Sequence, residues 1–93
     1  MWNYLRAEAD SKVICSGKTA KLSCAEIKAG YTPYSTHVRE EIARDAYLLK
    51  NGHVKQIEYH FYWSKGSGSI GADPKVLELL RQHGIPYKIH PPA

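Results

Sequence analysis

The sequence lacks any long apolar run. No uninterrupted apolar stretch approaches the roughly 18 residues that a membrane-spanning helix requires, and the opening residues lack the apolar middle of a secretory signal. We therefore expect a soluble chain. The sequence also lacks an internal repeat, and its 93 residues are enough for one modest core and too few for two. These features predict a single domain over residues 1–93.

Cysteine is scarce, with Cys15 and Cys24 as the two in the chain. Two cysteines alone do not make a zinc site. They bracket the segment SGKTAKLS, which is typical of the turn of a β-hairpin. With the turn centred on Lys18, Cys15 pairs beside Lys21, and Cys24 lies further along the hairpin than the roughly 7 Å that a disulfide spans between Cα atoms. We therefore expect two free thiols, and nothing else in the sequence indicates an oxidising compartment.

The composition is otherwise that of a globular protein with a mild basic bias. Apolar residues make up 43% and charged residues 24% of the chain, which argues against wholesale disorder. Thirteen Lys and Arg against nine Asp and Glu give a net charge of +4. This bias suits a polyanionic partner such as nucleic acid.

The spacing of apolar and turn-forming residues predicts the order helix, hairpin, helix, strand, helix and strand. The expected elements are a short helix over residues 2–9, a hairpin over 12–28, a helix over 37–50 capped by Ser35 or Thr36, a strand over 53–63, a helix starting at 73–74 and ending at Gly84, and a strand over 85–90. Pro86 favours an edge position for the last strand. Because strands and helices alternate in the second half, we expect parallel pairing there and an α/β fold with a mixed sheet and helices packed over it.

Glu26 and Lys28 form an E-x-K pair within the apolar and small residues of the second hairpin strand. Residues two apart on a strand share a face, so both side chains project together beside Cys24. Burying charge without partners is costly. The pair is therefore either a surface ion pair at the rim of the sheet or part of a cleft.

The hairpin register links this pair to a second carboxylate. A three-residue loop over 17–19 would place Asp10 opposite Glu26 on the same face of the sheet. Like charges at cross-strand distance repel, and a divalent cation such as Mg²⁺ or Mn²⁺ makes the arrangement favourable. Alternatively Asp10 ends a helix or is solvated, since a register slip of one residue turns it to the other face.

A carboxylate also interrupts the apolar stripe of the helix expected over residues 37–50. Asp45 lies on the stripe, with Glu41 one turn before it. The stripe is formed by Val38, Ile42 and Leu49. A carboxylate on a core-facing side needs a partner or a cleft. Two interpretations remain open for Asp45: a salt bridge to Arg39, Arg44 or Lys28, or a contribution to an active cleft.

His60 lies on the polar face of the strand expected over residues 53–63, beside Glu58. It is either a structural, hydrogen-bonded histidine or a substrate contact. The other histidines lie at helix ends, in turns or in the tail, without metal-ligand spacing, and we expect them to face solvent. They are His37, His53, His83 and His90.

The succession AEIKAG, REEIARDAYLLKNGHVKQIEYHF, a Gly-rich loop and DPKVLELLRQHGIPYKIH resembles restriction-endonuclease-fold toxin domains of bacterial polymorphic and contact-dependent growth inhibition toxins. The resemblance covers roughly residues 24 to 90. The acidic-x-lysine element of the PD-(D/E)xK nuclease motif corresponds to Glu26 and Lys28. The helix run corresponds to Ile42, Asp45, Ala46, Leu48 and Leu49, and a W-H-F triplet to Tyr59, His60 and Phe61. Tyr replaces Trp in the triplet, and no P-D precedes the hairpin turn.

The resemblance implies a restriction-endonuclease-like core and a metal-dependent endonuclease. Asp10, Glu26 and the carbonyl of Ile27 would hold Mg²⁺ or Mn²⁺, while Lys28 would orient the attacking water and stabilise charge on phosphorus. Asp45 and His60 complete the expected catalytic set. Nucleic acid phosphates would be met by Lys12, Lys18, Lys21, Arg39, Lys55 and Lys65, and by amides of the loop over 65–71, for which an unstructured linker is the alternative. Tyr31, Tyr34 and Tyr62 could stack on unpaired bases.

The resemblance further implies a toxin that is secreted or delivered by a bacterial toxin system and acts in the cytoplasm of the target cell. It slightly favours tRNA over DNA as the substrate, and it implies an immunity protein with an acidic surface. The alternatives are a non-catalytic nucleic-acid-binding module and a protein-interaction domain with a degenerate nuclease fold. The missing P-D favours these alternatives, whereas the E-x-K pair disfavours them.

Overall fold

The elements of the fold are set by the alternation and capping visible in the sequence. The computed structural model describes residues 11–17, 22–64, 66 and 68–92. Its elements are β1 (Ser11–Ser16), β2 (Ser23–Ala29), α1 (Thr36–Lys50), β3 (Gln56–Tyr62), α2 (Pro74–Gln82) and β4 (Tyr87–His90). The helix predicted over 2–9 lies outside the described residues. None of the described helices is long and apolar enough to cross a membrane.

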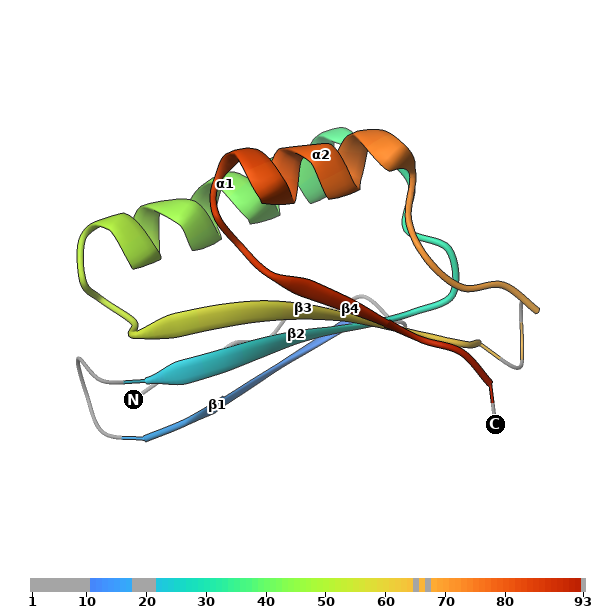
Figure 1. The fold of residues 1–93 in the computed structure, drawn as a ribbon, viewed down its shortest axis with the longest axis horizontal. Helices are drawn as coiled ribbons and strands as arrows, with labels where there is room; N and C mark the ends of the chain where they lie inside the picture. The colour runs from blue at the N-terminus through green and yellow to red at the C-terminus, as the bar shows by residue number, and fades with distance from the viewer. Residues whose placement is uncertain (1–10, 18–21, 65, 67, 93) are drawn as a thin grey trace.

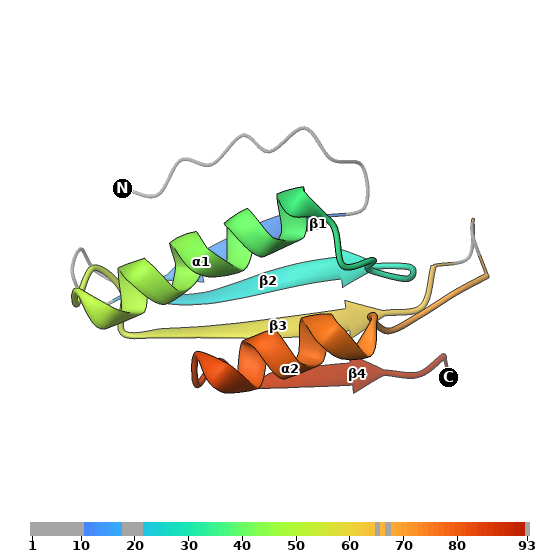
Figure 2. The ribbon, with the colours of Figure 1, turned by 90° about the horizontal axis from the view of Figure 1, so that it is seen from above.

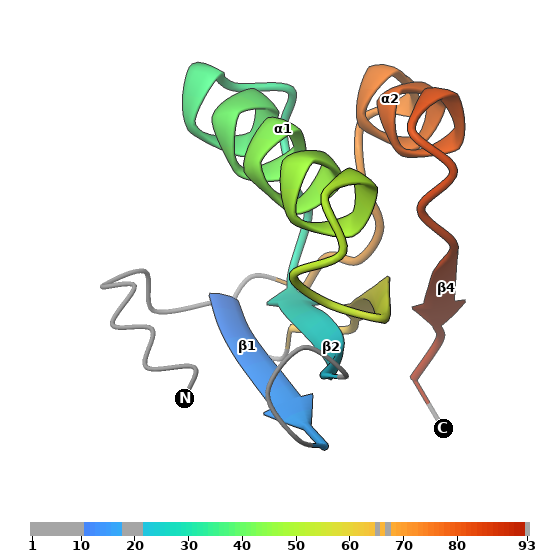
Figure 3. The ribbon, with the colours of Figure 1, turned by 90° about the vertical axis from the view of Figure 1, so that its left-hand side faces the viewer.

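The strands form one mixed sheet in the order β1-β2-β3-β4 (Figure 1). The β1–β2 pair is antiparallel, while β2–β3 and β3–β4 are parallel. Each parallel step crosses over through one helix, and both steps move in the same direction along the sheet. Crossovers of one hand then place their helices on the same face, and Figure 3 shows α1 and α2 together on one side of the sheet. The prediction of a mixed sheet with helices packed over it is confirmed.

Both helices begin at the predicted caps. The Ser35 hydroxyl accepts a hydrogen bond from the amide of Val38 at 3.2 Å, and the Asp73 carboxylate accepts one from the amide of Lys75 at 2.8 Å. These bonds satisfy amides that the first helical turn leaves without intrahelical partners. The predicted end of α1 is also confirmed, since Asn51 is its C-terminal cap.

The core lies between the sheet and the two helices. On β3, Ile57, Tyr59 and Phe61 are buried and alternate with more exposed residues, as the period of a strand requires. Seen from above, α1 lies over the β1–β2 side of the sheet and α2 over the β3–β4 side (Figure 2). The remaining apolar core residues are Cys24, Val38, Ile42, Val54, Val76, Leu80 and Ile85.

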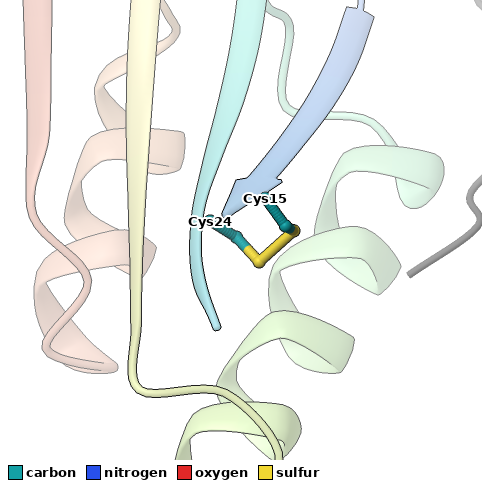
Figure 4. Close-up of a disulfide and its surroundings, with 2 residues drawn as sticks. All are labelled: Cys15 and Cys24. Carbon is teal, nitrogen blue, oxygen red and sulfur yellow. A yellow bond between two sulfur atoms is a disulfide. The ribbon is translucent and has the colours of Figure 1, made fainter. Parts of the chain in front are cut away.

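The predicted hairpin register is wrong. The six residues 17–22, rather than three, separate the paired Ser16 and Ser23. This longer loop places Cys15 directly opposite Cys24. The two cysteines form a disulfide with a Cα–Cα distance of 4.1 Å (Figure 4), so the expectation of two free thiols is wrong as well. The turn segment contains no short motif that fixes the length of the loop, so its sequence does not determine the register.

Candidate active site

The E-x-K pair lies on the side of the sheet that faces the helices. On β2, the burial pattern alternates, so Glu26 and Lys28 point inward and Ile27 between them is only partly buried. The exposed fractions of Glu26 and Lys28 are 1% and 4%. A surface ion pair at the rim of the sheet, one of the two interpretations of the sequence, is therefore wrong.

Helix α1 brings two carboxylates to the same place. Glu41 and Asp45 are four residues apart and so share one face of the helix, and each is 2% exposed. The prediction that Asp45 lies on the core-facing side is confirmed. We call the set Glu26, Lys28, Glu41, Asp45 and Tyr59 the buried polar cluster.

Two short contacts connect β2 and β3 to α1 within the buried polar cluster. The ammonium of Lys28 lies 2.6 Å from Oε1 of Glu41. The hydroxyl of Tyr59, a fully buried residue of β3, donates to Oδ2 of Asp45, also at 2.6 Å. Glu26 is the direct neighbour of Tyr59 across the parallel β2–β3 pair. Each strand that contributes to the cluster is thus tied to α1 by a charged hydrogen bond, which is stronger than a neutral one.

The buried polar cluster contains three carboxylates and one ammonium. Charges in a protein interior are retained only where partners and hydrogen bonds offset the loss of hydration. Carboxylates are also groups that interact favourably with a cation. This arrangement can polarise a bound group and hold a proton donor, Lys28, in a fixed orientation.

The donor chemistry of the cluster fits the metal that the sequence predicts. Carboxylate oxygens are the ligands that Mg²⁺ and Mn²⁺ prefer. Within residues 11–17, 22–64, 66 and 68–92, however, no group of three or more His, Cys, Asp or Glu side chains is placed to hold an ion. Asp10 lies outside the described residues. Val13, rather than Asp10, is the residue that pairs with Glu26 across β1 and β2. The predicted convergence of Asp10 and Glu26 through strand pairing is therefore wrong.

His60 is separated from the buried polar cluster. Because side chains alternate along a strand, His60 projects from the opposite face of β3 to Tyr59 and therefore to Glu26. There its ring contacts Glu58 at 3.0 Å and His90 at 2.8 Å. His60 is hydrogen-bonded, as one of its two interpretations requires. The expectation that His90 faces solvent is wrong, because His90 is half-buried against His60. The other three histidines are exposed, as predicted.

The residues predicted to contact nucleic acid are only partly described. Arg39 and Lys55 are exposed. The guanidinium of Arg39 lies 5.4 Å from the ring centroid of Tyr34, and the ammonium of Lys75 lies 5.8 Å from the same centroid. Lys75 was not among the residues predicted to contact nucleic acid, because the sequence around the start of its helix does not indicate its contact with Tyr34. Lys18, Lys21 and Lys65, and the side chain of Lys12, lie outside the described residues.

The described part of the Gly/Ser loop is tied to the segment that follows β2. The amide of Thr32 donates to the carbonyl of Gly71 at 2.9 Å, and the amide of Asp73 donates to the carbonyl of Thr32 at 3.0 Å. The amide of Tyr31 donates to the hydroxyl of Ser69 at 3.0 Å. An unstructured linker is therefore the wrong interpretation for this part of the loop. Three exposed tyrosines lie at or near the carboxyl ends of β2 and β3: Tyr31, Tyr34 and Tyr62.

Glu41 and Tyr59 were not assigned to the site from the sequence. The spacing of four residues between Glu41 and Asp45 was the signal that could have identified Glu41. Nothing local in the sequence pairs Tyr59 with Asp45.

No protein-family model, curated protein or solved structure matches the chain.

Proposed function

We propose that the chain is a metal-dependent endonuclease that hydrolyses phosphodiester bonds of nucleic acid. The observation that carries the proposal is the burial of Glu26 and Lys28 beside Glu41 and Asp45 in so small a core. Apolar residues of similar volume would stabilise such a core as well or better. A cluster of this composition is therefore better explained by chemistry than by stability.

The side chains of the cluster have distinct roles in this proposal. Glu26 and the carbonyl of Ile27 would hold Mg²⁺ or Mn²⁺, and a bound ion of this kind would polarise the scissile phosphate. Lys28 would stabilise negative charge on the phosphate oxygens and orient the attacking water. Glu41 fixes the ammonium of Lys28 through their 2.6 Å contact.

The biological setting is proposed from the resemblance to nuclease toxins. The domain would be secreted or delivered by a bacterial toxin system and would act on tRNA, or less favourably DNA, in the cytoplasm of a target cell. Its net charge of +4 suits either polyanion. A cognate immunity protein with an acidic surface would neutralise it.

A second candidate function is favoured by one observation. Every member of the buried polar cluster is at most 4% exposed, and a phosphodiester can reach it only if the layer over it opens. In a non-catalytic nucleic-acid-binding or protein-interaction module, the same cluster would only anchor α1 to the sheet. The two candidates differ in whether any cleavage occurs.

The deciding experiment incubates purified protein with plasmid DNA and with total tRNA in Mg²⁺, Mn²⁺ or EDTA. We expect cleavage that EDTA abolishes. Glu26→Gln and Lys28→Met should each lower the rate by about two or more orders of magnitude, the size of metal and electrostatic contributions to catalysis. Glu40→Gln and Lys50→Met, which change exposed residues of α1, are matched controls and should cleave normally.

Circular dichroism and urea unfolding establish that each variant is folded before its rate is compared. Cleavage that survives EDTA, or a folded Glu26→Gln protein that cuts at the normal rate, would contradict the proposal. Binding of nucleic acid without any cleavage would favour the non-catalytic module.

A further inference from the structure

Exposed aromatic side chains gather at the carboxyl end of the parallel strands. Among the described residues, five tyrosine or tryptophan side chains are exposed, and four of them lie at this end. The four are Tyr31, Tyr34, Tyr62 and Trp63, with exposed fractions between 38% and 50%. At this end of the sheet β2 and β3 finish and both helices begin (Figure 2). Exposed apolar surface that is concentrated in one region is typical of an interaction site.

Strand pairing brings the last residues of three strands together. Tyr62 ends β3 and pairs with Ala29 at the end of β2 and with His90 at the end of β4. Because side chains alternate along a strand, Tyr62 projects away from the buried Phe61, onto the face that neither described helix covers (Figure 3). Ala29 carries only a methyl group, so no large side chain of its β2 partner occupies the space beside Tyr62.

The ring of Tyr62 is fixed by stacking on one of its two faces. The ring of His90 lies against it, with centroids 4.3 Å apart and planes 5° from parallel. His90 is held in turn by a 2.8 Å hydrogen bond between its ring and that of His60. Tyr62 is nevertheless 38% exposed, so its exposed area lies on the other face and the edge of the ring. A ring that is held on one face and open on the other is a preorganised surface for a further planar group.

Two further exposed rings flank Tyr62. Trp63 follows it directly in the chain. Tyr31 follows Gly30, whose amide donates to the carbonyl of Tyr62 at 3.0 Å, and the amide of Tyr31 donates to the hydroxyl of Ser69, also at 3.0 Å. The backbone that carries these rings is therefore tied both to β3 and to the Gly/Ser loop. We call Tyr31, Tyr62 and Trp63 the stacking platform.

Two cations are held beside the fourth ring, that of Tyr34. The guanidinium of Arg39 and the ammonium of Lys75 lie 5.4 and 5.8 Å from its centroid. Arg39 also donates to the hydroxyl of Thr36 at 3.0 Å. Within the described part of the chain, neither cation forms an ion pair with a carboxylate. We call Arg39 and Lys75 the cation pair, and both of its charges are available to an anion.

We propose that the stacking platform binds unpaired bases of a single-stranded nucleic acid and that the cation pair contacts its phosphates. An aromatic ring stacks on the face of any base, whereas the bases of a duplex are already stacked on one another. Protein partners also bury aromatic anchors. Two fixed cations beside the rings and the net charge of +4 favour a polyanion instead.

The stacking platform rests on the proposed function for the class of its ligand, and it narrows the substrate to unpaired segments such as loops and single-stranded ends. Single-stranded RNA and single-stranded DNA share the chemistry that the platform recognises. Because the platform is exposed, binding to it does not require the layer over the buried polar cluster to open. Binding and cleavage can therefore be measured separately.

The test measures binding of labelled oligonucleotides of about eight nucleotides to the full chain by fluorescence anisotropy, in EDTA so that no metal-dependent cleavage occurs. The ligands are single-stranded RNA, single-stranded DNA and the duplexes of the same sequence. We expect single strands to bind about tenfold or more tightly than duplexes, and any difference between RNA and DNA identifies the preferred strand.

Substitutions separate stacking from charge. Tyr62→Leu should weaken single-strand binding about five- to 150-fold, the range for loss of one stacked base, whereas Tyr62→Trp keeps a stacking ring and should retain the affinity. Arg39→Met and Lys75→Met should each make the dependence of log K on log salt concentration shallower by about 0.7, the value for one lost phosphate contact. Tyr47→Leu and Lys50→Met are matched controls at exposed sites toward the other end of α1, and neither should change binding.

Equal affinity for single strands and duplexes would overturn the proposal, as would a folded Tyr62→Leu protein that binds single strands like the wild type. Should Tyr62→Leu fail to fold, Tyr31→Leu decides, since the side chain of Tyr31 is 50% exposed and its loss must also weaken binding. The absence of any oligonucleotide binding would overturn the proposal and leave a protein as the partner of this surface. Metal-dependent cleavage without a preference for single strands would refute the platform alone, and single-strand binding without cleavage would refute the endonuclease alone.

Discussion

Reduction of the Cys15–Cys24 disulfide should destabilise the domain by a predictable amount. The bond joins residues nine apart in sequence. For a closed loop of about ten residues, the chain-entropy relation gives about 2.7 kcal/mol at 25 °C. For 93 residues the entropy of unfolding is about 0.2 kcal/mol/K, which converts this loss into a fall in Tm of about 14 °C.

Urea unfolding of oxidised and reduced protein measures this cost directly. With a slope of about 1.3 kcal/mol/M, the midpoint should fall by about 2 M urea on reduction. The comparison keeps both sulfur atoms in place, so it isolates the cross-link from the packing of Cys24, which is 7% exposed. A Cys15→Ser/Cys24→Ser variant is a second comparison and should be indifferent to reductant.

Two results would refute the reasoning about the hairpin. Intact mass under non-reducing conditions must be lower by two hydrogen atoms than after reduction; equal masses would mean that the thiols are free and that the disulfide does not form. Equal urea midpoints for oxidised and reduced protein would mean that the unfolded chain gains no freedom when the bond is broken.

Two further predictions follow from the buried polar cluster and the proposed toxin function. Tyr59→Phe removes the hydroxyl that donates to Asp45 and should lower the free energy of unfolding by about 1–3 kcal/mol. The control Tyr47→Phe, at an exposed site of α1, should change the free energy of unfolding by less than about 0.5 kcal/mol. Equal effects of the two substitutions would contradict the structural role of the hydrogen bond between Tyr59 and Asp45. A cognate immunity protein should be encoded in the neighbouring open reading frame and, when co-expressed, should protect the host, with an association rate that falls steeply with salt. If the protein encoded in the neighbouring open reading frame neither binds the domain nor protects the host, the result would contradict the proposed toxin function.

The helices and β3 were predictable because their signals are local. Ser35 and Asp73 mark helix starts through a side chain that reaches an amide only two or three residues away. The alternation of Ile57, Tyr59 and Phe61 identifies both the strand and its buried face. The hairpin register was not predictable, since it depends on a six-residue loop whose length no turn motif fixes.

The candidate site was predictable only within single elements. Strand periodicity placed Glu26 and Lys28 on one face, and helical spacing placed Asp45 on the stripe that faces the core. The partners Glu41 and Tyr59 became visible only once α1 was packed on the sheet. Contacts between residues far apart in sequence depend on strand order and on which helix covers which strand, and neither is encoded in local spacing.

The two edges of the sheet are secured in different ways. Among the described strands, β1 and β4 each pair with one neighbour. The disulfide ties β1 covalently to β2, whereas β4, with four residues, is held by its backbone ladder and side-chain contacts to β3. Strands with few partners open at lower free-energy cost than the central core.

Fluctuations of the sheet should therefore be asymmetric. Opening should begin at β4 and expose the outer edge of β3, while β1 and β2 remain joined even when their hydrogen bonds break. The hydrogen bond between Nδ1 of His60 and Nε2 of His90 is one of the side-chain contacts that hold β4 on β3. Loss of these contacts would free the edge of β3 to pair with an extended segment of another chain.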